Sequence, residues 1–186
     1  MGGFRPVERI FEPSDLSSPP ISVAVLREYL RVSHNTEDGL IGDLAAAATG
    51  HVERFIQQLL TRRPAVLRLP CLPPARIPIE LPGGPVGAVT DFKVDGVSIS
   101  PLPVAAGHSP ALLMPATDWQ VAVGTGYPVE INYTVGFAVI PAPLRVALMM
   151  VVADLYDRRG SMVDGNLSEA PVAAAALMRP FRVRPA

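Results

Sequence analysis

The chain has 186 residues, of which 49% are apolar, and its formal net charge is −1. This length and composition suit a folded domain with a sizeable core, and the near-zero charge does not indicate nucleic-acid binding. The single cysteine, Cys71, excludes a disulfide framework or a cysteine zinc site built within the chain. The start lacks the pattern of a secretion signal, and the longest apolar run is shorter than the ~20 residues of a membrane helix. We therefore expect synthesis in the bacterial cytoplasm and no contact with a membrane.

The N-terminal third predicts an arm followed by two helices. Residues 1–20 carry four prolines and mixed charges, so we expect an N-terminal arm outside the folded domain. Ser22 can cap a short helix over residues 23–31. A long helix is expected over residues 37–61, because its apolar residues recur at three- and four-residue spacing and acidic residues occupy its first turn.

The middle of the chain predicts an antiparallel β block over residues 64–136. The helical period disappears there, and six prolines separate short apolar runs. "VTDFKVDGVSI" alternates on both sides of Asp95-Gly96 and is typical of a hairpin. "DWQVAV" and "VEINYTVGF" are predicted to be further strands.

Two helices, over residues 143–159 and 168–178, and a basic tail over 179–186 complete the prediction. The fold class is therefore α+β: a helical bundle interrupted by the β block, in one domain that spans residues 21–178. "VALMMVVA" in the third helix has no polar residue. A surface helix needs only one apolar stripe. We expect Leu144, Leu148 and their neighbours at three- and four-residue spacing to face the bundle.

The remaining apolar residues of that helix need a second partner. We assign Val146, Met149, Met150 and Ala153 either to the overlying β block or to an interface with another subunit, as a hypothesis. The tail is a candidate docking peptide, because aromatic residues and arginines often anchor interfaces. Its alternative is a frayed, solvated end. The residues assigned to docking are Met178, Arg179, Phe181, Arg182 and Arg184.

Catalytic motifs are weak in this sequence. "HVERF" at His51 resembles half of a zinc-helix motif without its second histidine, and Asp154 and Asp157 lie three apart beside arginines that can pair with them. We therefore expect no catalytic residue, cofactor or metal. A small hydrolase that uses these three residues is the less favoured alternative, and a host-type protein-binding module is another.

The order of motifs resembles the head–tail connector (adaptor) proteins of tailed bacteriophages and phage-like gene transfer particles. "VEINYTVGFAVIPAPLRVALMMVVADLYDRRG" carries the strongest likeness: a strand, a glycine break, two prolines and a helix that ends in Tyr-x-x-Arg. "ISVAVLREYLRVSHNTEDGLIGDLAAAATGHVERF", "LPGGPVGAVTDFKVDG" and "ALMRPFRV" are similar to the opening, middle and closing motifs of that family. The resemblance covers residues 21–184.

This resemblance implies a structural virion protein and not an enzyme. Such a protein forms a ring, typically dodecameric, that joins the capsid portal to stopper or tail-completion proteins. DNA passes through the channel of the ring without sequence-specific binding. The resemblance therefore implies a place at the head–tail junction of a particle, with the portal, the stopper and further copies of the chain as partners.

Overall fold

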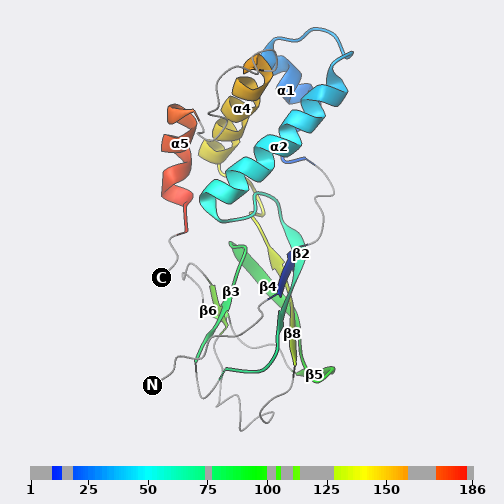
Figure 1. Ribbon diagram of the computed structural model, residues 1–186, viewed down its shortest axis with the longest axis vertical. Coiled ribbons are helices and arrows are strands. Elements are labelled where there is room, and N and C mark those ends of the chain that lie inside the picture. Colours follow the sequence, from blue (N-terminus) through cyan, green and yellow to red (C-terminus); the bar gives the residue numbers. More distant parts are fainter. Residues whose placement is uncertain are drawn as a thin grey trace. The chain divides into compact units, whose positions relative to one another are not determined.

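A computed structural model describes residues 10–13, 19–73, 77–99, 104–105, 111–113, 128–158 and 171–183. They fall into two compact units. One unit holds the strands, from the described residues up to Asp15 and from Arg62 to Phe137; the other holds the helices, from Leu16–Thr61 and Ala138–Arg184 (Figure 1). The α+β class and the antiparallel β block between the second and third helices are therefore confirmed.

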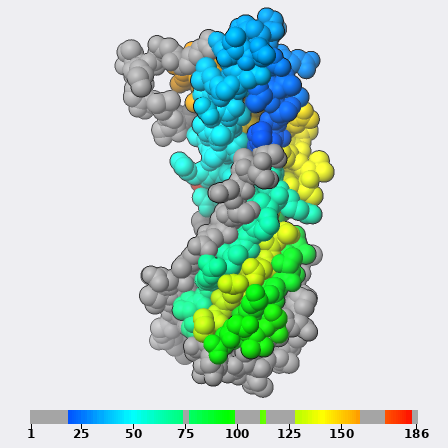
Figure 2. Space-filling view, turned by 90° about the vertical axis from the view of Figure 1, so that its right-hand side faces the viewer, coloured from blue at the N-terminus to red at the C-terminus, as the bar shows by residue number. Residues whose placement is uncertain are grey.

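A five-stranded antiparallel sheet forms the larger part of the β unit. Its order is β1-β2-β8-β4-β5, and its strands are β1 (Ile10–Pro13), β2 (Arg63–Leu69), β8 (Val129–Val135), β4 (Val86–Val94) and β5 (Val97–Ile99). Figure 2 shows β2, β8 and β4 side by side, as that order requires. Every second residue of β8 is buried, so the sheet has one core face and one outer face.

A second sheet, of order β3-β7-β6, completes the β unit. Its strands are β3 (Ile79–Leu81), β7 (Ala111–Leu113) and β6 (Val104–Ala105). The largest fully buried side chains of the β unit are Tyr133, Phe92, Leu67, Ile131, Leu81 and Leu113. The Tyr133 hydroxyl donates a hydrogen bond to the Pro82 carbonyl (3.0 Å), which satisfies its polar end inside this core.

The β4–β5 hairpin forms where the sequence predicts it. Asp95 and Gly96 both have positive φ, 51° and 77°, as a two-residue hairpin turn with the right twist requires. Lys93 pairs with Ser98 across the turn. The predicted strand "DWQVAV" lies outside the described residues.

The N-terminal arm differs from the expectation. Residues 10–13 form β1, which pairs antiparallel with β2 from Ile10 opposite Arg68 to Pro13 opposite Ala65. β2 would otherwise leave a row of unpaired N–H and C=O groups along this edge of the sheet. Local composition did not reveal this pairing, because it depends on a partner about fifty residues away in sequence.

The helical unit comprises α1 (Val23–Leu30), α2 (Asp38–Ile56), α4 (Ala142–Asp157), α5 (Val172–Met178) and the short 3₁₀ helix η2 (Arg179–Phe181). α4 packs against α1, α2 and α5. α2 and α4 pack antiparallel. The end of α4 lies beside the start of α2, where the Tyr156 hydroxyl donates a hydrogen bond to Glu37. None of the helices in the described part of the chain is long and apolar enough to span a membrane.

Two predicted helix boundaries differ from the structure. The long helix, expected to reach residue 61, ends at Ile56 because Gln57 adopts the left-handed conformation (φ 60°) and the Glu53 carboxylate then accepts the Leu60 N–H (2.8 Å). The last helix, expected from residue 168, begins at Val172 behind Pro171 in the described residues.

Candidate functional site

The core side of α4 matches the predicted bundle face. Pro141 and Pro143 set the start of the helix, where a missing backbone N–H costs little. The buried residues are Leu144, Ala147, Leu148, Val151 and Val152. Leu155, expected to share this face, is half-buried. In the part of the chain that the structure describes, the opposite side of the helix carries none of these fully buried residues.

That opposite side carries one continuous apolar stripe. Val146, Met149, Met150 and Ala153 follow the spacing i, i+3, i+4 and i+7, which places all four on one face of the helix. Val146 is 37% exposed, and the other three are half-buried. The helical unit therefore leaves these side chains partly in contact with water, although none of them is polar.

The stripe continues beyond the residues that the sequence singled out. Ala142 and Pro143 are exposed, and Val139, in the segment before the helix, is 83% exposed. Ala142 and Pro143 extend the same three- and four-residue spacing backwards from Val146, whereas Val139 precedes the helix and is not placed on this face by helical spacing. We call the following set the outer stripe: Ala142, Pro143, Val146, Met149, Met150 and Ala153. Sequence reasoning missed Ala142 and Pro143 because it started the apolar surface further inside the helix; the unbroken spacing was the signal.

The C-terminal segment lies against the end of α2. Met178, which the docking hypothesis includes, is fully buried and belongs to the core of the helical unit. Arg179 and Arg182 are exposed, and Phe181 is half-buried. Arg184 lies outside the described residues. The exposed arginines are therefore the residues of the predicted docking set that an external partner can reach directly.

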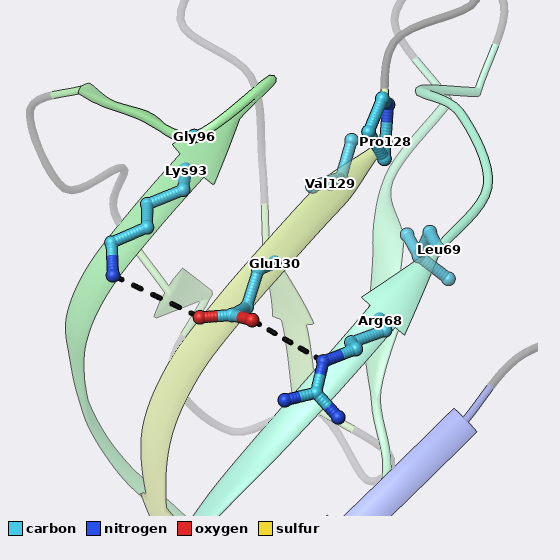
Figure 3. Close-up of a pocket in the computed structure, with 7 residues that line it drawn as sticks. All are labelled: Arg68, Leu69, Lys93, Gly96, Pro128, Val129 and Glu130. Carbon is cyan, nitrogen blue, oxygen red and sulfur yellow. Dashed lines mark hydrogen bonds and ion pairs between the residues drawn. The ribbon is translucent and has the colours of Figure 1, made fainter.

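A row of charges crosses the outer face of the larger sheet. Arg68, Glu130 and Lys93 are direct cross-strand partners on β2, β8 and β4. Glu130 lies between the two cations, 3.2 Å from Arg68 Nε and 3.8 Å from Lys93 Nζ (Figure 3). An open hollow of about 430 Å³ borders this row. Its lining residues are Arg68, Leu69, Lys93, Gly96, Pro128, Val129 and Glu130.

The carboxylates of this face are held in their charged form. The Asn132 amide donates a hydrogen bond to Glu130 and, with Arg68 and Lys93, lowers the pKa of Glu130 against the opposing effect of burial. Burial likewise raises the pKa of Asp91, but hydrogen bonds from Ser98 and Lys93 outweigh it, so its pKa is also lowered. Carboxylates that are paired in this way are poor proton acceptors, and the arrangement is typical of a structural network across strands.

The three hydrolase candidates occupy different parts of the helical unit. Asp154 pairs with Arg158 (2.9 Å) near the end of α4, and Asp157 is exposed one turn later. His51 lies on α2, fourteen residues beyond Glu37, which contacts the end of α4. At 1.5 Å per residue this separates His51 from that end by about 20 Å. Among the described residues, no group of three histidine, cysteine or acidic side chains could hold a metal ion.

No protein-family model and no curated protein sequence matches the chain. Solved structures do. A chain in the neck of an empty gene transfer agent (GTA) particle, computed with C6 symmetry, is 22% identical with a TM-score of 0.75 and covers 95% of this chain and 97% of its own length. This protein has the fold of a GTA particle component. A chain in the virion of the native GTA particle (22% identity, TM-score 0.74, 95% and 97% covered) has the same fold. So does one in the neck of the native particle computed with C12 symmetry (21% identity, TM-score 0.73, 94% and 97% covered).

Proposed function

We propose that this protein is a head–tail connector (adaptor): a structural, non-enzymatic subunit of a ring in the neck of a phage-like particle. One observation carries the proposal: the fold is that of a neck chain over 95% of this sequence and 97% of that chain. The motifs over residues 21–184 resemble the same family. The C6 and C12 symmetry of the neck structures supports a ring, and the family resemblance implies twelve copies.

In this proposal the outer stripe of α4 lies between neighbouring subunits. A ring subunit buries surface on both flanks, and an apolar helix face that its own bundle leaves half-exposed suits such a contact. Full burial of an exposed methionine side chain contributes about 1.5–3 kcal/mol. Met149 and Met150 are already half-buried, so burial of the rest in a subunit contact supplies about half of this figure from each, and their flexible side chains adapt to the neighbouring surface.

The double variant Met149→Asp, Met150→Asp tests this contact. With aspartate at both positions, a subunit contact must either bury two carboxylates or hold the two subunits apart. We therefore expect the equilibrium constant for ring formation to fall at least about 100-fold. The matched control is Met149→Leu, Met150→Leu, which keeps volume and apolarity. Circular dichroism of the soluble subunit checks that both variants fold. Folded aspartate variants that still assemble normally would place the stripe away from the interface.

The C-terminal tail is assigned to docking on the portal protein, and the opposite side of the ring to stopper or tail-completion proteins. The exposed Arg179 and Arg182 support this assignment, because arginine is common among interface anchors. The near-neutral chain suits a channel through which DNA passes without specific binding. The particle's neck is accordingly the proposed location, with no cofactor and no membrane contact.

Truncation after Met178 tests portal docking. It removes the tail but keeps the buried Met178, whereas a cut after Leu177 would also open the core. We expect folded, truncated subunits to leave heads without tails in a complementation assay of particle infectivity or DNA transfer. Normal joining of heads to tails by the truncated subunit would contradict the docking role.

A further inference from the structure

The last described residues run back across the C-terminal end of α2. The final carbonyls of a helix have no partner within the helix and must find one elsewhere. The Val183 N–H donates a hydrogen bond to the Ile56 carbonyl, the last residue of α2, at 3.0 Å. The backbone of the tail therefore completes the hydrogen bonding of a helix that lies more than 120 residues earlier in the chain.

Two side chains of the same helix end hold the segment in place. The Gln58 amide donates a hydrogen bond to the Phe181 carbonyl. The Arg182 guanidinium lies over the Phe55 ring, 5.6 Å from its centre, at a distance typical of cation–π contacts. The positive charge of Arg182 also suits the negative end of the α2 dipole. Residues 181–183 are thus held at three successive positions.

These contacts occupy groups that a docking peptide would offer to a partner. Phe181 is half-buried and its carbonyl is bound, and the Val183 N–H is bound as well, so neither the aromatic anchor nor the backbone is free. Among residues 179–183, the exposed side chains are those of Arg179, Pro180 and Arg182. A partner that takes up the tail must therefore first displace it from α2.

We propose that residues 181–183 form a latch, which is closed on the end of α2 in the free subunit and opens when the tail docks. The identity of the partner, the portal, rests on the proposed function; the latch itself does not. Each contact of the latch is weak, because a single hydrogen bond of this kind shifts an equilibrium roughly 2- to 10-fold, and only a few such contacts hold the latch closed. The open state is therefore a minor population that a partner can select, and the apparent docking affinity equals the affinity of the open subunit multiplied by the fraction of subunits that are open.

Trypsin gives a direct readout of the open state. Arg179 and Arg184 each precede a proline and resist cleavage, so Arg182-Val183 is the one efficient tryptic bond of the tail. It lies inside the latch, and a protease needs a locally open, extended segment. Loss of residues 183–186 from the full-length protein, followed by mass spectrometry at short times, therefore measures opening.

The test compares Gln58→Ala with Gln57→Ala. Gln58 holds the Phe181 carbonyl, whereas the neighbouring Gln57 is exposed and is the matched control. We expect cleavage at Arg182 to be roughly 2- to 10-fold faster in Gln58→Ala and unchanged in Gln57→Ala. Equal rates in all three proteins, or rapid cleavage of the wild type at the rate of an unstructured peptide, would overturn the latch.

Binding to the purified portal protein separates the latch from the docking role. If opening precedes docking, Gln58→Ala tightens portal binding by up to the same factor as it speeds cleavage. Unchanged or weaker binding by Gln58→Ala overturns the coupling between latch and docking. A wild-type subunit that does not bind the portal at all refutes the docking function, while the cleavage rates still decide whether the latch exists.

Discussion

Gly87 in β4 gives a sharp test of the packing of the β unit. β4 and β8 lose their regular register between Val86 and Asp91. There the Thr134 hydroxyl donates to the Ala88 carbonyl (3.5 Å) and accepts from the Ala88 N–H (3.0 Å). A Cβ at residue 87 would lie only 2.4 Å from the Thr134 hydroxyl oxygen. Gly87→Ala therefore forces Thr134 to rotate or the strand to shift.

The expected cost follows from what that rotation breaks. Rotation of Thr134 removes its bonds to Ala88, of which the shorter contributes about 0.5–1.5 kcal/mol. A strained rotamer adds about 0.5–1.5 kcal/mol if Thr134 cannot turn fully. Alanine also lowers the conformational entropy of the unfolded chain, which stabilises the folded protein by about 0.4–1 kcal/mol and offsets part of this cost. We expect a net loss of about 1–2 kcal/mol in the free energy of unfolding.

Urea denaturation followed by circular dichroism measures this loss, with Gly50→Ala as the control. Gly50 is an exposed interior residue of α2 with nothing within 4 Å of the added Cβ, so its substitution should stabilise by about 0.5–1 kcal/mol. In a Thr134→Ala background the clashing hydroxyl is absent, so the cost of Gly87→Ala should shrink. An equal cost in both backgrounds, or stabilisation by Gly87→Ala alone, would refute the reasoning.

Three further predictions concern single groups. Tyr133→Phe leaves the Pro82 carbonyl without this donor and should cost about 1 kcal/mol in urea denaturation; an unchanged midpoint would contradict the bond. Arg31→Gly at the left-handed end of α1 (φ 59°) should raise the melting temperature through a gain of about 1 kcal/mol, and a lower melting temperature would argue against backbone strain there. Because the folded pKa values of Asp91 and Glu130 lie below their ordinary 3.8 and 4.5, their stabilising contribution is fully present above about pH 4.5 and is lost as pH falls through the lowered values. Acid titration of Glu130→Gln should show a shallower loss of stability below pH 4.5, and a slope equal to that of the wild type would contradict this network.

Local pattern was enough to predict much of the fold. The alternation in β8, the Asp95-Gly96 turn and the core side of α4 all follow from short-range spacing, which the chain carries in adjacent residues. The end of α2 did not follow, because Gln57 adopts a left-handed conformation that glycine or asparagine would have signalled. Strand β1 was missed for a different reason: a proline-bearing segment becomes a strand only through an edge that another segment provides.

The candidate site was predictable only in part. The hydrophobic spacing of α4 indicated four residues of the outer stripe, but Ala142 and Pro143, at the start of the helix, were not considered. Met178, predicted to end the last helix, was included in the docking set because it stands next to the tail, yet it is fully buried. The latch depends on contacts between residues about 125 positions apart. The spacing of residues within one segment does not predict contacts between segments so far apart in the sequence.

The most direct test of the account is electron cryomicroscopy of phage-like particles assembled with this chain. The account predicts a closed ring of repeated copies at the neck, in which the outer stripe of each α4, with Met149 and Met150 at its centre, is buried against the adjacent copy. Absence of the chain from the neck, or a neck ring in which the stripe faces solvent, would contradict it.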